Sequence, residues 1–492
     1  MKTSLAISTS ILLLSGPWAN AAPPPNIVLI FADDLGWKDV GYQGTDFMET
    51  PNIDRLAKGG MVFTAGYAAA GNCAPSRACL LSGNYTPRHG VYAVGSTDRG
   101  PKNEMRLVPI PNKSGLAKEN ITIADALKAA GYATGIFGKW HLSGKNGTEP
   151  GEQGFDVVFQ SGGGWSKKEP DNPKGIYSLT RAACEFMEQN KDRPFFVYLP
   201  HYAIHSGLQA RDSTLEKFKA KQPGQQHHNP MYAACTYELD NGVGILLKKL
   251  ADLGLEKNTL VVFTSDNGGV QGSSQEPLRG SKGGYYEGGI REPFIIRWPG
   301  VTQPGSRCDV PVINVDLFPT FLAAAGAPVP AGKVLDGESL LPLLKGEAPL
   351  KRQAIFWHFP GYLNSPVNRG RELDVRTGFR TRPISVIHKG DWKLHLFIEE
   401  WQLDGGRAKL AQNNAVELYN LKEDIGERNN LASANPAKRD ELLDDLLAWH
   451  KSVHAPLPSQ PDPKYAPGAP DGKKKGKGKG RKNSSAGDSS EE

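Results

Sequence analysis

Hydrophobic runs alternate with stretches of helical periodicity between residues 26 and 325 of this 492-residue chain. Residues 26–31 form a continuous apolar run, which is typical of a parallel strand buried on both faces. Similar runs lie at residues 132–137, 195–199, 260–264 and 294–298. Amphipathic helices are predicted at residues 121–130, 231–253 and 315–325. This alternation predicts an α/β fold built on a large, doubly wound, mostly parallel sheet.

The pattern changes near residue 348. Beyond it come short β-like runs at residues 354–359, 392–397 and 417–420, followed by a helix at residues 438–450. We therefore predict a large α/β domain over residues 22–348. A smaller C-terminal domain with an antiparallel sheet and a helix is expected over residues 349–457.

Residues 1–21 have the pattern of a signal peptide. Lys2 is followed by an apolar run at residues 5–14, which is too short to span a bilayer, and Ala19-Asn20-Ala21 fits a cleavage site. The chain is therefore expected to be exported, to the periplasm or the medium. No later segment reaches transmembrane length, so no membrane span is predicted.

The net charge of +6 is unevenly distributed, because residues 471–492 contain seven Lys and Arg against four Asp and Glu. The Gly- and Lys-rich run at residues 472–482 has no apolar side chain to bury, so we expect residues 458–492 to be a disordered basic tail. A solvated tail without a specific partner is favoured over one that binds an acidic glycan, and no nucleic-acid partner is expected.

The segment from Cys73 to Gly83 combines several helix signals. Pro75 suits the first turn, the residues from Arg77 to Leu81 are good helix formers, and Gly83 is a typical stop. Cys73 is therefore predicted at a helix N-terminus, where free N–H groups favour an anion. The other four of the five cysteines leave any disulfide pairing open.

Cys73-Ala-Pro-Ser-Arg77, followed by Leu81-Ser-Gly83, resembles the signature of the formylglycine-dependent (type I) sulfatases of the alkaline-phosphatase-like superfamily. The resemblance implies that a maturation enzyme oxidises Cys73 to formylglycine. It also implies that the hydrated aldehyde, a diol, attacks the sulfur of a sulfate ester with one oxygen and later expels sulfate with the other. The alternative is an ordinary buried cysteine at a helix start.

Acidic and amide side chains follow two of the predicted strands. Asp33 and Asp34 come directly after residues 26–31, and Asp266 and Asn267 come after residues 260–264. Because parallel strands end at the same edge of a sheet, these oxygens are expected to converge and to hold a hard cation. The resemblance implies one Ca²⁺ bound by these four residues and by the group at Cys73.

Three further segments resemble parts of sulfatase sites. Gly138-Lys139-Trp-His141 implies that Lys139 bridges diol and sulfate and that His141 holds the diol hydroxyl. Lys282, in Lys-x4-Glu-Gly-Gly-Ile-Arg, is expected to contact the sulfate, while Glu287 and Arg291 are expected to be structural. Arg77 would hold the diol and the carboxylates in place.

Two histidines follow the predicted strand at residues 195–199. His205 matches the family histidine better than His201, although Gly207 stands where the family usually has proline. His205 is expected to protonate the leaving alkoxide, since an imidazole can hold a proton near neutral pH. His201 is expected to be a packing residue.

The sequence therefore predicts an exported sulfatase that uses formylglycine and Ca²⁺. The substrate is expected to be a sulfated saccharide, bound by aromatic and polar residues from Trp357 to Tyr362 and by basic ones from Arg369 to Arg382, unless both stretches are ordinary loops. A phosphomonoester or phosphonate-ester hydrolase and a sulfated-glycan binding protein without catalysis remain alternatives. The sugar, the sulfate position and the oligomeric state stay open.

Overall fold

The computed structural model describes residues 23–145, 147–160, 169–270, 272–364 and 379–468. An eight-stranded sheet has the strand order β5-β4-β6-β1-β7-β8-β2-β9. Its strands are β1 (Asn26–Ala32), β2 (Met61–Phe63), β4 (Ala133–Phe137), β5 (Val157–Phe159), β6 (Phe195–Pro200), β7 (Thr259–Ser265), β8 (Ile295–Arg297) and β9 (Ser306–Cys308). The predicted α/β fold is confirmed.

The neighbouring strands β5, β4, β6, β1 and β7 are all parallel. β1 lies in the middle, so that Leu29 is paired with Tyr198 of β6 and with Val262 of β7. The carboxyl ends of β4, β6, β1 and β7 consequently meet along one edge of the sheet. Segments that are far apart in the sequence become neighbours there.

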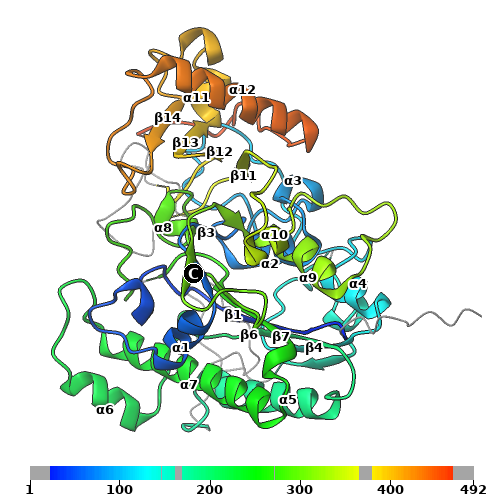
Figure 1. Cartoon of the computed structure of the whole chain (residues 1–492). Helices are drawn as coiled ribbons and strands as arrows, with labels where there is room; N and C mark the ends of the chain where they lie inside the picture. The colour runs from blue at the N-terminus through cyan, green and yellow to red at the C-terminus, as the bar shows by residue number, and fades with distance from the viewer. Residues whose placement is uncertain (1–22, 146, 161–168, 271, 365–378, 469–492) are drawn as a thin grey trace, which may run out of the picture.

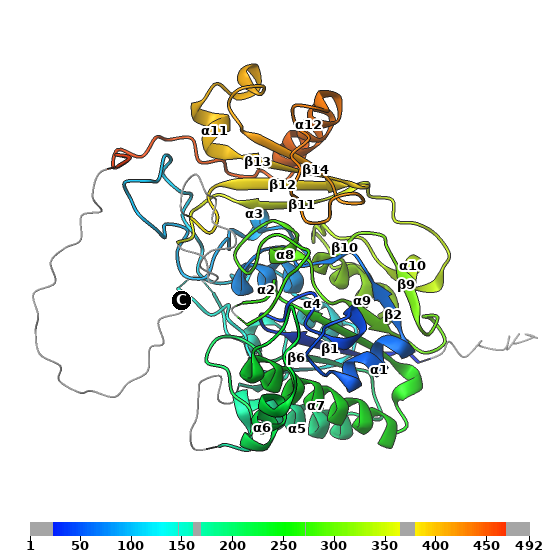
Figure 2. The ribbon, with the colours of Figure 1, turned by 90° about the vertical axis from the view of Figure 1, so that its left-hand side faces the viewer.

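Helices cover both faces of this sheet (Figures 1 and 2). One face carries α1 (Pro51–Gly59), α5 (Ile176–Gln189), α6 (Asp212–Ala220) and α7 (Pro230–Asp252). The other carries α2 (Cys73–Ser82), α4 (Ile123–Ala129), α9 (Leu317–Ala325) and α10 (Leu341–Lys345). Alternate residues of β1 point to opposite faces of the sheet. Val28 and Ile30 pack on the face covered by α1, α5, α6 and α7, and Ile27 and Leu29 pack on the other face. The continuous apolar run follows from this double burial.

A four-stranded antiparallel sheet with the order β11-β12-β13-β14 forms the C-terminal part. It consists of β11 (Ala354–Phe359), β12 (Ile384–Lys389), β13 (Trp392–Phe397) and β14 (Val416–Asn420), with α11 (Ile398–Leu403) and α12 (Pro436–Ser452). The remaining short elements are β3 (Gly66–Tyr67), β10 (Val312–Ile313), α3 (Thr86–His89) and α8 (Glu287–Ile290). The predicted second sheet is confirmed.

Strand β12 is absent from the sequence prediction. Its pattern is interrupted by Ser385 and His388, which are polar but buried. Ser385 Oγ lies 2.8 Å from Nδ1 of His358 and 2.9 Å from Nε2 of His450, so its burial is compensated by partners far away in the sequence. No local pattern contains that information.

The C-terminal sheet shares a hydrophobic core with the side of the α/β part that carries helix α2. Tyr67, Cys79 and Tyr285 pack in one cluster with Trp357 and Val386. Trp357 and Tyr362 are at most 1% exposed, so the aromatic stretch considered for sugar binding belongs to the interior. The indole nitrogen of Trp357 donates to the carbonyl oxygen of Ala68.

Buried ion pairs also join the two parts. Lys393 Nζ of β13 lies 2.8 Å from Glu287 Oε1 and 3.1 Å from Glu427 Oε1, and all three side chains are fully buried. Arg291 Nη1 lies 2.8 Å from the second oxygen of Glu287. Although burial alone would raise the pKa of Glu287, Lys393 and Arg291 lower it to about 2. Glu287 and Arg291 thus fix the loop that follows Lys282.

Replacing Lys393 is expected to destabilise the protein strongly. Lys393→Met removes the cation that the buried carboxylates of Glu287 and Glu427 share and leaves Arg291 as the remaining cation beside Glu287. Breaking a buried ion pair in this way typically costs about 3–5 kcal/mol. Lys389→Met is the matched control on the neighbouring strand, since Lys389 pairs with Glu441 and Asp445 near the surface and should lose less than about 1 kcal/mol. Urea unfolding measures both, and equal losses would contradict the assignment.

Part of the predicted disordered tail is folded against the rest of the protein. Residues 458–468 were expected to be disordered, but they pair with residues 103–108: Val108 N donates to Gln460 O, and Asp462 N to Arg106 O. The predicted signal peptide and the rest of the tail lie outside the described residues. None of the five cysteines, all of which lie in the described ranges, forms a disulfide. Among the described helices, none is both long and apolar enough to cross a membrane.

Candidate active site

The acidic groups predicted from the strand ends do converge. Asp33 and Asp34 follow β1, Asp266 and Asn267 follow β7, and all four are fully buried. The main chain at Asp34 donates to Asp266 Oδ1 at 3.1 Å, and the Asn267 amide donates to Asp34 Oδ1 at 2.7 Å. Asp34 has a φ of 64°, which is unusual for a residue other than glycine. This strained backbone turns its carboxylate into the cluster.

Helix α2 brings Cys73 and Arg77 to the same cluster. Cys73 is the first residue of the helix, as predicted, and its Sγ lies 3.9 Å from Asp34 Oδ1. Arg77 sits one turn further, with Nη2 2.7 Å from Asp266 Oδ2, and its Nη1 donates to the carbonyl oxygen of Lys139. Arg77 therefore ties the helix to both β7 and the segment after β4.

Two lysines face the carboxylates. Lys139 Nζ lies 2.8 Å from Asp33 Oδ2, and Lys282 Nζ lies 2.9 Å from Asp34 Oδ2. Burial alone would lower the pKa of both amines, but the neighbouring carboxylates raise it above the ordinary lysine value. Both ammonium groups therefore stay charged at neutral pH. Gly138 makes the path to Lys139 possible, because a Cβ there would lie 1.9 Å from the Pro200 carbonyl oxygen.

The two histidines after β6 have different environments. His205 Nε2 lies 3.8 Å from Asp34 Oδ2, and its side chain is 16% exposed at the rim of the site. Burial lowers its pKa, while Asp34 and Asp33 oppose that shift. His201 is fully buried, both its ring nitrogens are without a hydrogen-bond partner among the described residues, and burial lowers its pKa to about 3. His201 is thus placed as a packing residue.

Gly207, which departs from the family pattern, has a φ of 75°. Proline cannot adopt this angle because its ring fixes φ near −65°. The loop after His205 therefore takes a path that the usual proline would not allow. His141, at the end of the segment after β4, is half-buried and also has a positive φ, of 64°.

The donor set suits a hard divalent cation. Single ligand atoms of Asp33, Asp34, Cys73 and Asp266 all lie within 4.8 Å of one another. Asp33 Oδ1 and Asn267 Oδ1 are buried and have no hydrogen-bond partner in the described structure. Burial and the neighbouring Asp33 raise the pKa of Asp266 to about 7 despite Arg77. A cation would satisfy the orphaned oxygens and relieve this repulsion, and carboxylate and amide oxygens are ligands that Ca²⁺ and Mg²⁺ prefer.

Lys174 is a site neighbour that the sequence analysis missed. It is 3% exposed, and its Nζ donates to the carbonyl oxygen of Ser206 at 3.1 Å, directly after His205. Its main-chain N–H donates to Gln209 Oε1 in the same loop. Lys174 thereby fixes the loop that carries His205. Only the tertiary contact shows this, because no motif surrounds Lys174.

A family model described as Sulfatase matches residues 25–327. The chain belongs to the sulfatase family. A second family model, described as N-sulphoglucosamine sulphohydrolase, C-terminal, matches residues 281–394.

Individual relatives span nearly the whole of this sulfatase. A sulfatase of Formosa agariphila is 32% identical, with 89% of this chain and 90% of the relative covered. Human arylsulfatase A is 32% identical, with 89% of each chain covered. The structure of Ps i-CgsB in complex with k-i-k-neocarrahexaose is 30% identical, has a TM-score of 0.68, and covers 89% of this chain and 94% of its own.

These relatives confirm the predicted class of reaction. This sulfatase is a sulfuric ester hydrolase. The relatives therefore favour the predicted sulfatase over the two alternatives, a phosphomonoester or phosphonate-ester hydrolase and a sulfated-glycan binding protein without catalysis.

Proposed function

We propose that this sulfatase hydrolyses sulfate esters of saccharides at the Cys73 cluster, after conversion of Cys73 to formylglycine and with one calcium ion. Formylglycine would supply a hydrated aldehyde, whose two hydroxyl groups allow both attack on a sulfate ester and release of sulfate. The observation that carries the proposal is the position of Cys73 at a helix N-terminus, beside the clustered carboxylates and the two lysines that pair with them.

The unmodified thiol is poorly suited to act as the nucleophile. Burial raises the pKa of Cys73 well above its usual value, even though Lys139 and Lys282 act in the opposite direction. Since the thiolate is the reactive form of cysteine, this shift disfavours the unmodified side chain as the nucleophile. This supports a modification that replaces the sulfur.

Asp33, Asp34, Asp266 and Asn267 would hold the cation, and a cation there would withdraw charge from the sulfate oxygens. Lys139 pairs with Asp33 and Lys282 pairs with Asp34, so both ammonium groups would be available to a sulfate bound next to residue 73. Arg77 keeps Asp266 in position through two nitrogen atoms. Fixed positive charge around a group that becomes more negative is the usual source of such rate acceleration.

His205 would protonate the leaving alcohol, and His141 would hold the proton of the hydroxyl at residue 73. His205 is suited to this because its ring is at the rim of the site, where the alcohol has to leave. Burial lowers the pKa of His205, and the charge of Asp34 offsets part of that shift. Its Nδ1 lies 3.1 Å from Ser206 Oγ, which orients the ring.

The test of the function is sulfate release by purified, matured protein from nitrophenyl sulfate and from defined sulfated saccharides. Support for saccharides comes from the sequence-related Ps i-CgsB, whose structure contains a neocarrahexaose. Release from neither class of ester would refute the proposal. Export through residues 1–21 is part of the proposal too, and N-terminal sequencing of the mature protein should start at Ala22.

His205→Ala should discriminate between leaving groups. We expect a loss of about 10²- to 10⁴-fold on sulfated sugars, because an alkoxide needs a proton, and a much smaller loss on nitrophenyl sulfate, whose phenolate leaves without help. His141→Ala is the matched comparison and should reduce both activities alike. If His205→Ala lost both equally, the general acid would be misassigned, and steady-state kinetics on the two substrates decides this.

A further inference from the structure

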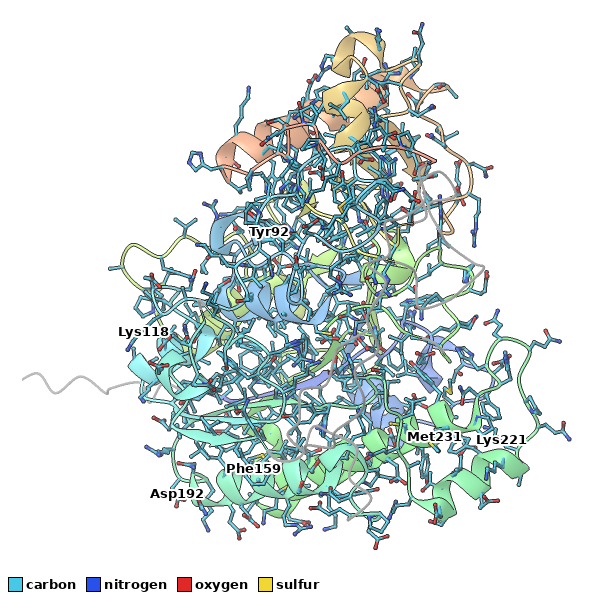
Figure 3. All side chains as sticks on the ribbon, turned by 180° about the vertical axis from the view of Figure 1, so that it is seen from behind. Tyr92, Lys118, Phe159, Asp192, Lys221 and Met231 are labelled. Carbon is cyan, nitrogen blue, oxygen red and sulfur yellow. The ribbon has the colours of Figure 1, made fainter. Side chains whose placement is uncertain are left out.

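A fully buried histidine, His227, lies against the loop that follows β1, and no motif of the sequence analysis includes it. It belongs to the segment between α6 and α7. Figure 3 labels Lys221 at the start of this segment and Met231 just after its end, both in the α/β part. The Nε2 of His227 lies 3.1 Å from Asp39 Oδ1, and its Nδ1 lies 3.0 Å from Asp46 Oδ1. Both ring nitrogens therefore face carboxylates.

These two contacts require the charged form of the imidazole. A carboxylate has no proton to donate, so both nitrogens of His227 have to carry one. Burial alone would lower the pKa of His227, but the hydrogen bonds and charges of Asp39 and Asp46 raise it above the ordinary histidine value. Burial would raise the pKa of Asp46, but its hydrogen bonds to Gln226 and His227 lower it to about 2. His227 is therefore an imidazolium held between two carboxylates.

Asp39 links this positive charge to the turn just after Asp34. Asp39 is fully buried, and its Oδ2 accepts hydrogen bonds from Gly36 N at 2.8 Å and from the Tyr232 hydroxyl at 2.6 Å. The main-chain N–H of Asp39 donates to Gly36 O. Because one carboxylate oxygen has two donors and the other faces His227, Asp39 acts only as an acceptor. It thereby ties the turn to His227 and to α7.

The same turn supports the strained backbone of Asp34, whose φ is 64°. Gly36 follows two residues later, and the Tyr232 hydroxyl lies 3.4 Å from the carbonyl oxygen of Asp34. On the other side, Leu35 N donates to Ser265 Oγ of β7. A strained conformation persists only where the surrounding structure holds it. The contacts of Asp39 and Tyr232 therefore help to fix the direction of the Asp34 carboxylate.

We propose that His227, acting through Asp39, is a positioning residue that holds the turn of Asp33 and Asp34 in the shape that binds the cation. The inference rests on the proposed function, because it presupposes a divalent ion at these carboxylates. Without His227, the buried carboxylate of Asp39 would lose its paired cation, and the turn would be expected to loosen. Groups that orient metal ligands typically change metal affinity by about 10- to 100-fold when they are removed.

Two substitutions separate the two nitrogens of His227. The amide nitrogen of a glutamine takes nearly the place of Nε2, and that of an asparagine takes nearly the place of Nδ1. His227→Gln therefore keeps a donor towards Asp39 and loses the donor towards Asp46, whereas His227→Asn does the reverse. The pair distinguishes the link to Asp39 from the mere filling of a buried position.

The test is the dissociation constant of Ca²⁺, measured by calorimetry on the full-length protein after treatment with a chelator. His227→Asn should weaken binding by about 10- to 100-fold, and His227→Gln should recover most of the affinity. Hydrolysis of nitrophenyl sulfate should follow the same order. His227→Asn should lose activity at low Ca²⁺ and recover most of it at saturating Ca²⁺, which a general loss of folding would not allow.

His450→Asn is the matched control. His450 is also buried and has a polar partner, since its Nε2 lies 2.9 Å from Ser385 Oγ, but it belongs to α12 of the C-terminal part. This substitution should lower thermal stability and leave the Ca²⁺ affinity unchanged. If His227→Asn does not fold, Tyr232→Phe tests the same link, because it removes only the hydroxyl that donates to Asp39. Its Ca²⁺ affinity should fall by about 3- to 10-fold, as expected for one lost hydrogen bond.

Unchanged Ca²⁺ affinity in His227→Asn or in Tyr232→Phe would overturn this inference alone. Equal losses in His227→Gln and His227→Asn would do the same, because the link to Asp39 would then not decide the affinity. So would a loss in His450→Asn as large as that in His227→Asn. A wild type that binds no divalent ion would instead refute the cation of the proposed function as well.

Discussion

Cys73→Ser and Cys73→Ala should both abolish catalytic turnover. The expected loss is on the order of 10⁶-fold, comparable to removal of the nucleophile from another hydrolase. A serine supplies one hydroxyl, so at best it allows a single attack without release of sulfate, whereas alanine allows none. Mass spectrometry of the wild-type peptide that contains residue 73 should show an aldehyde in place of the thiol.

Cys79→Ala is the matched control, because Cys79 lies on the same helix with its Sγ 3.4 Å from His89 Nε2, away from the carboxylates. It should retain activity at normal expression. Thermal melting of both Cys73 variants should stay close to that of the wild type, which excludes misfolding as the cause. Full activity of Cys73→Ala, or an unmodified thiol in fully active enzyme, would disprove the assigned role.

Asp266→Ala should lower activity on the order of 10⁴-fold. The change removes a proposed cation ligand, and a bound metal typically contributes several kcal/mol to such reactions. It also leaves Arg77 buried without its closest carboxylate, so the cluster loses order as well. Metal analysis by mass spectrometry should find one divalent ion per wild-type chain and less in the variant.

Asp336→Ala is a useful control, since Asp336 is also mostly buried and binds an arginine, Arg88, but outside the site. It should leave the metal content unchanged. Chelation of the wild type should reproduce the loss caused by Asp266→Ala, and added Ca²⁺ should reverse it. A metal-free wild type with full activity would rule out the cation site.

The convergence of the site could be predicted because its residues sit at the ends of strands. Asp33, Asp266, Lys139 and His205 each follow a recognisable apolar run, and a parallel sheet brings such ends to one edge. The family signature around Cys73 added the chemistry. Both the strand ends and the signature around Cys73 are local features of the sequence, so they can be recognised without any tertiary contact.

Other features could not be predicted because distant partners create them. Lys174 is a site neighbour only through the Ser206 carbonyl, and β12 tolerates buried Ser385 only because His358 and His450 meet it. Arg380 and Arg382 are two positions apart in one basic stretch, yet one lies over Gly283 and the other pairs with Glu399. The sequence shows where the charged residues are, whereas only the fold shows which contact each of them makes.

The α/β part and the C-terminal sheet share a hydrophobic core, in which Tyr67, Cys79 and Tyr285 pack with Trp357 and Val386. This shared core limits how the chain can be divided. Removing residues after 348 would expose those aromatic rings to water and free the Lys282 loop from Lys393. A fragment that ends at the composition change would therefore be prone to aggregate and would lack an ordered catalytic lysine. The visible boundary in the sequence marks a change of architecture, whereas the shared core leads us to expect that both sheets unfold as one cooperative unit.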